Sequence, residues 1–92
     1  MLNAKVKNII GNAGEPVKNQ FIIYTSEGVY FQSYDSVIAF RDRAGNVTLD
    51  RNAWDYSTTT GKYRNIFLNE DKKTTEKKIK DGVYKLADLN ED

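Results

Sequence analysis

The chain has 92 residues, no cysteine and no histidine, and its 14 basic and 13 acidic side chains give a net charge of +1. The missing cysteines exclude disulfides, zinc–thiolate sites and thiol catalysis, and the missing histidines remove the commonest general base and metal ligand. This length predicts a single domain, residues 1–92, with residues 1–19 and 87–92 more loosely ordered than the rest.

Residues 1–19 leave two interpretations open. Val6, Ile9 and Ile10 follow the i, i+3, i+4 spacing of a short helix, but the same stretch would also suit an edge strand. Residues 11–14, Gly-Asn-Ala-Gly, then predict a turn or loop.

Strand signals are clear from residue 20 onward. Residues 20–25 are rich in β-branched and aromatic side chains that point both ways, so we expect this strand to be central or covered on both faces. Short turns separate three further predicted strands, residues 29–34, 37–42 and 47–50. This succession predicts an antiparallel meander.

The period changes after residue 54. Ser57 or one of the three following threonines can cap a helix, and Tyr63, Ile66 and Phe67 then share one face. A second helix is predicted over residues 71–81, followed by Gly82. Only Ile79, with Thr75, can anchor it, so it should lie on the surface.

A last short strand is predicted over residues 83–86. Together these elements predict an α+β fold, in which an antiparallel β-meander of four to five strands packs against one amphipathic helix, with a second helix on the surface.

Aromatic residues are the first candidates for binding. Trp54 and Tyr56 could form a recognition surface or simply pack at a strand-to-helix corner. Aromatic side chains of the predicted strands could stack on single-stranded bases or pair within the sheet: Phe21, Tyr24, Tyr30, Phe31, Tyr34 and Phe40. Tyr34, Trp54 and Tyr56 are the aromatic residues that we select as binding candidates.

Basic residues are the second candidates. Residues 61–85 carry eight basic and four acidic side chains. Helical spacing places Lys73, Lys77 and Lys80 along one side, where they could contact phosphates or an acidic partner, or be a solvated face. Lys62 and Arg64 near a helix start could bind an anion, although the sequence there does not match a P-loop.

Carboxylates raise the question of an enzyme. Residues 70–72, Glu-Asp-Lys, contain the Glu-x-Lys of some metal-dependent nucleases, with Asp50 and Asp55 upstream. In those enzymes the motif lies on a buried strand, whereas here it lies in a polar linker or helix start. We therefore predict no enzymatic activity, no metal and no cofactor.

Several blocks in combination carry a family resemblance that covers most of residues 19–86. They are Asn-Gln-Phe-Ile-Ile from residue 19, Tyr-Phe-Gln-Ser-Tyr from 30, Trp-Asp-Tyr-Ser from 54, Thr-Gly-Lys-Tyr from 60 and Phe-Leu from 67. With these blocks the chain resembles a family of small, functionally uncharacterised proteins carried by bacteriophages and mobile elements of low-GC bacteria.

The resemblance implies an accessory protein that acts inside an infected cell. No apolar run reaches the roughly 20 residues of a membrane span, and the start lacks the apolar stretch of a signal peptide, so we expect a cytoplasmic protein. The preferred hypothesis is a non-enzymatic protein that binds a host or phage protein, for example as a counter-defence inhibitor. The alternative is a nucleic-acid-binding module, and a homodimer through an exposed edge strand is a further expectation.

Overall fold

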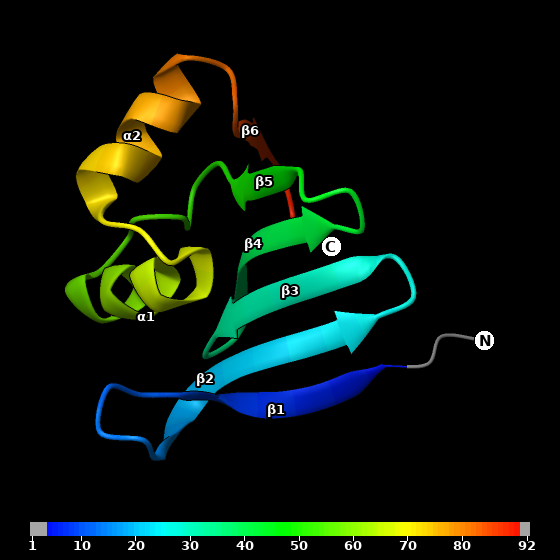
Figure 1. Ribbon diagram of the computed structural model, residues 1–92, viewed down its shortest axis with the longest axis vertical. Coiled ribbons are helices and arrows are strands. Elements are labelled where there is room, and N and C mark those ends of the chain that lie inside the picture. Colours follow the sequence, from blue (N-terminus) through cyan, green and yellow to red (C-terminus); the bar gives the residue numbers. More distant parts are fainter. Residues whose placement is uncertain (1–3, 91–92) are drawn as a thin grey trace.

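A computed structural model describes residues 4–90 of the chain. These residues form an α+β domain with six strands in one sheet and two helices. Figure 1 shows how the helices and the sheet are arranged. The elements in chain order are β1 (Lys5–Ile10), β2 (Pro16–Thr25), β3 (Gly28–Ser33), β4 (Ser36–Asp42), β5 (Val47–Asp50), α1 (Thr58–Leu68), α2 (Lys72–Lys80) and β6 (Lys85–Ala87). The predicted class is confirmed, and the sheet has one strand more than the upper predicted number.

The additional strand is β1. It lies at the edge of the sheet and pairs antiparallel with β2, so the edge-strand interpretation is confirmed and the helix interpretation is wrong. Pairing with β2 satisfies the backbone of this stretch, which one or two isolated helical turns could not do.

Residues in both of the segments that were expected to be loosely ordered form hydrogen bonds. Near the amino end, the Gly11 N–H donates to the Glu15 carbonyl. Near the carboxyl end, the Leu89 N–H donates to Asp50, and the Asn90 side chain exchanges hydrogen bonds with the backbone of Val37. The expectation of looser order also covered residues 1–3 and 91–92, which lie outside the described residues.

The strands follow one another across the sheet in chain order. Pairing is antiparallel from β1 to β5, which confirms the meander and the central position of β2, and β6 is parallel to β5. The parallel pair arises because α1 and α2 form a long crossover between the two strands. The last strand begins two residues later than predicted, since Val83 and Tyr84 still donate their N–H groups to the Lys78 carbonyl.

Local signals explain where the helices begin and end. Ser57 caps α1 by accepting a hydrogen bond of 3.1 Å from the Thr60 N–H, and Asp71 caps α2 in the same way. Gly82 follows α2 with a φ of 78°, a conformation that glycine adopts without a Cβ penalty. The predicted anchor of α2 is confirmed, because Thr75 is fully buried and Ile79 packs against the core.

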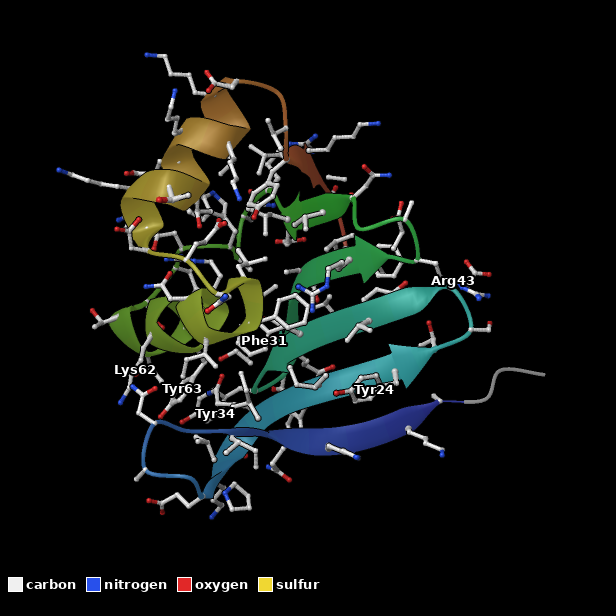
Figure 2. All side chains as sticks on the ribbon, viewed as in Figure 1. Tyr24, Phe31, Tyr34, Arg43, Lys62 and Tyr63 are labelled. Atoms are coloured by element: carbon white, nitrogen blue, oxygen red, sulfur yellow. The ribbon has the colours of Figure 1, made fainter. Side chains whose placement is uncertain are left out.

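The hydrophobic core lies between one face of the sheet and the helices. Phe31 of β3 stacks on Phe67 of α1 with ring centroids 5.8 Å apart, and Figure 2 shows Phe31 between these two elements. The Ser33 hydroxyl meets the Thr60 hydroxyl at 3.2 Å, and the Arg41 guanidinium lies 4.5 Å from the centre of the Phe67 ring. We call this side of the sheet the helix face and the opposite side the open face.

Candidate functional site

A row of side chains crosses the open face from one edge of the sheet to the other. In an antiparallel sheet, directly paired residues point to the same face, and successive residues alternate between faces. Phe31 points toward the helices, so its neighbour Tyr30 points to the opposite face. The residues paired with Tyr30 across the sheet point to that face as well. The row consists of Val6, Ile23, Tyr30, Phe40, Thr48 and Lys85.

The four residues of this row on β1 to β4 form an apolar surface outside the hydrophobic core. Tyr30 and Phe40 are its centre, with ring centroids 4.4 Å apart. Ile23 flanks Tyr30 on β2, and Val6, which is 60% exposed, ends the row on β1. None of the four belongs to the core cluster or to the side chains packed against it. We refer to Val6, Ile23, Tyr30 and Phe40 as the open-face row.

Sequence reasoning considered Tyr30 and Phe40 only as stacking or cross-strand residues and did not select them as a site. The available signal was the lack of apolar–polar alternation within β2. Phe21, Ile22 and Ile23 are all apolar, although successive residues of a strand point to opposite faces. A strand that is apolar on both sides needs two covers. The fold supplies one, because α1 and α2 both pack on the helix face.

Trp54 and Tyr56 lie in the connection between β5 and α1, and they differ in exposure. Trp54 is half-buried and packs against the core, with the Arg64 guanidinium 5.2 Å from the centre of its ring. Tyr56 is 51% exposed. Packing at the strand-to-helix corner therefore describes Trp54, and only Tyr56 offers an accessible ring.

Arg64 is buried, with 1% of its surface exposed, and its guanidinium is engaged by the protein itself. It donates to the Trp54 carbonyl at 2.8 Å, to the Asp55 carboxylate at 3.0 Å and to the Asn65 side chain at 2.9 Å. The sequence-based expectation that Arg64 contacts an external anion does not fit this position. Its side chain fastens α1 to the preceding connection.

Asp55 joins this arrangement to α2. Lys72 Nζ lies 2.7 Å from its second carboxylate oxygen. Burial acts to raise the pKa of Asp55, but the hydrogen bonds from Lys72 and Arg64 outweigh burial and hold this pKa below its ordinary value. A hollow of about 600 Å³ beside the start of α1 is lined by Lys62, Lys72 and Arg64 together with Asp55. Asp55 is ion-paired with both Arg64 and Lys72, so these two cations already have a carboxylate partner within the protein, while the charged lining of the hollow remains net positive.

The lysines of α2 divide into two groups. Lys72 and Lys78 bind carboxylates of the protein, with Lys78 Nζ 2.7 Å from Glu70. Lys73, Lys77 and Lys80 are exposed, and of these Lys77 pairs with Asp81 at 3.1 Å. The predicted basic side of the second helix is thus at the surface.

Tyr34 lies in the turn between β3 and β4, directly after Ser33, whose hydroxyl meets that of Thr60 in α1. It is 52% exposed and has a φ of 53°, which side chains with a Cβ rarely adopt. Its N–H donates to the carbonyl of Asn19, which also has a positive φ of 67°. The predicted site residues therefore come from three parts of the chain: this turn, the connection before α1 together with α1 itself, and α2.

Among residues 4–90, no three carboxylates gather where they could hold a metal ion. Within the same part of the chain, neither helix has the length and apolar character that crossing a bilayer requires.

Comparison with known proteins identifies the family. The model of a family of unknown function, DUF8033, matches residues 4–82, so the chain belongs to this family. The resemblance to an uncharacterised family is thereby confirmed. No curated protein and no solved structure matches the chain.

Proposed function

We propose that this domain acts by binding another protein, and that its contact surface is the open-face row. The observation that carries the proposal is a continuous line of apolar side chains, centred on Tyr30 and Phe40, on the side of the sheet opposite both helices. Aromatic residues dominate the binding energy of protein interfaces, and an apolar surface outside the core is a common mark of such an interface.

The cellular setting belongs to the same proposal. The sequence blocks of the phage and mobile-element family suggest an accessory protein in the bacterial cytoplasm. A small binding domain can serve there by occupying the surface of a host protein, including one used in defence against phage. This mode of action requires no catalytic group and no cofactor.

The test is an affinity capture from a low-GC bacterial lysate, read by mass spectrometry, with matched variants of the bait. Tyr30→Thr with Phe40→Thr removes the aromatic pair, while threonine keeps a high preference for strands. Lys73→Glu with Lys77→Glu changes a distant, exposed surface on α2 and is the control. We expect a protein that is captured by the wild type and the α2 variant, resists nuclease and is lost with the open-face variant.

Nucleic-acid binding is the alternative function. It is supported by the exposure of Lys73, Lys77 and Lys80 on α2. Binding through phosphates would weaken steeply as salt rises, and the α2 variant would lose it. Capture that disappears with nuclease or with the α2 variant would therefore contradict the protein-binding proposal and favour this alternative.

A further inference from the structure

The two edges of the sheet differ in how well they can accept another strand. β6 has three residues, and Arg51 already donates hydrogen bonds to the carbonyls of Leu86 and Ala87. β1 has six residues and pairs on one side only, with β2. The backbone groups that point away from an edge strand are free to form hydrogen bonds with an added strand. Within residues 4–90, β1 is thus the edge suited to accept one.

The two faces of β1 differ in chemistry over its first three residues, Lys5, Val6 and Lys7. On the open face, Val6 is 60% exposed and continues the apolar row up to the edge of the sheet. On the other face, Lys5 and Lys7 pair with Tyr24 and Ile22 of β2, and both lysines are exposed. Figure 2 shows Tyr24 on the part of β2 that lies away from α1, where the helices leave the helix face uncovered. Neither lysine forms an ion pair with residues 4–90.

This pattern disfavours two of the antiparallel registers in which a second copy of the chain could add its own β1 strand. In an antiparallel pair of two β1 strands centred on Val6, each Lys5 would lie opposite a Lys7 of the other copy. A pair centred on Lys7 would place the two Lys7 side chains opposite each other. Like charges directly opposite across a sheet are destabilising, whereas opposite charges stabilise the pair. The edge therefore selects for carboxylates on the face of Lys5 and Lys7.

We infer that β1 binds an extended segment of a partner protein as a seventh strand, with acidic residues facing Lys5 and Lys7 and apolar residues facing Val6. Strand addition obtains affinity from main-chain hydrogen bonds and specificity from alternate side chains. The outer edge of β1 offers the backbone groups, and Lys5, Val6 and Lys7 offer the alternating side chains. The inference rests on the proposed function, because it describes how the partner of the open-face row reaches the sheet.

The test is an NMR titration of the isotope-labelled full chain with capped eight-residue peptides at up to millimolar concentration. One peptide alternates glutamate and valine, a second alternates lysine and valine, and a third is the glutamate peptide with N-methyl groups on alternate residues. We expect shifts centred on the amides of Lys5–Ile10 with the first peptide. The second should bind at least about tenfold more weakly, since two attractive charge pairs become repulsive. The third should lose binding because strand hydrogen bonds are blocked.

Reversing the charges of Lys5 and Lys7 separates a change in peptide preference from a loss of folding, because an unfolded variant would bind neither peptide. Lys5→Glu with Lys7→Glu should reverse the preference, so that the lysine peptide becomes the tighter ligand. The matched control, Lys77→Glu with Lys80→Glu, makes the same change of net charge on α2 and should leave the preference unchanged. Equal affinity for the two unmodified peptides, shifts centred on α2, or no binding at millimolar peptide would overturn the inference.

The two proposals can fail separately. Peptides that leave β1 unperturbed, together with a captured protein that still depends on Tyr30 and Phe40, would refute strand addition and leave the proposed function standing. In the opposite case, peptides bind β1 as described but no captured protein depends on the aromatic pair. The proposed function then fails, and β1 accepts an added strand without any contribution from the open-face row.

Discussion

Replacing Arg64 by methionine tests whether the buried guanidinium holds the connection before α1 in place. Methionine keeps most of the length and the apolar stem, so the substitution mainly removes the donors. The hydrogen bonds lost are those to the Trp54 carbonyl, the Asp55 carboxylate and the Asn65 side chain. A net hydrogen bond contributes about 1 kcal/mol and one to a charged group about 1.5–3 kcal/mol.

Two features reduce the total loss. Arg64 Nε is buried without a partner among the described residues, so removing the guanidinium also removes a desolvation cost. Asp55 is 28% exposed and keeps its ion pair with Lys72, so it does not become an isolated buried charge. We therefore expect Arg64→Met to lower the free energy of unfolding by about 3 kcal/mol, which for a domain of this size corresponds to roughly 12–24 °C in Tm.

The control is Lys72→Met, which removes the other cation from the same carboxylate. The Lys72 side chain is 51% exposed, so this ion pair should contribute no more than about 1 kcal/mol. Urea unfolding followed by circular dichroism gives both values. A cost below about 1 kcal/mol for Arg64→Met, or equal costs for the two variants, would show that the buried guanidinium is not what fastens α1.

Three further predictions concern acid stability and backbone conformation. Burial acts to raise the pKa of Glu70, but hydrogen bonds from Lys78, Thr75 and Tyr84 outweigh burial and lower this pKa from 4.5. The stabilisation is therefore complete above about pH 5 and lost as pH falls through the lowered value, so Glu70→Gln should flatten the acid limb of a stability–pH profile. Tyr34→Gly should exceed Tyr34→Ala in stability by about 1 kcal/mol, because only glycine adopts a positive φ freely; equal urea midpoints would contradict this. Gly28→Ala should cost about 2–3 kcal/mol by urea unfolding, since its Cβ would lie 2.3 Å from the Arg41 carbonyl oxygen, and a neutral effect would refute the close contact.

Features that depend on neighbouring residues could be predicted from the sequence. Ser57 and Gly82 mark helix boundaries through hydrogen bonds and backbone freedom within one turn, so the signal and its effect are close together. The burial of Arg64 could not be predicted in this way. It depends on the Trp54 carbonyl and the Asp55 carboxylate, ten and nine residues away along the chain, both binding one guanidinium. A short basic segment gives no indication of such convergence, which is why Arg64 resembled a surface cation.

The direction of the last strand is a similar case. A short apolar run after a helix predicts a strand but not its neighbour, and only the packing of α1 and α2 places β6 parallel to β5. The edge position of β1 was one of two open interpretations, since Val6, Ile9 and Ile10 fit both periods over so short a stretch. Pairing with β2 decided between them, and pairing is a long-range property.

The open-face row follows from a mismatch that the sequence already contains. Phe21, Ile22 and Ile23 make β2 apolar on both sides, so the sheet needs a cover on each face. Both helices pack on the helix face, and α2 contributes only Ile79 and the buried Thr75 to that packing. One helix layer can bury one face, which leaves the Tyr30 side of the sheet without a cover within residues 4–90. A small domain gains stability mainly from apolar burial, so selection for folding alone would favour polar residues on that side. The aromatic pair of Tyr30 and Phe40 on that side is therefore the basis of the proposal that another protein supplies this cover.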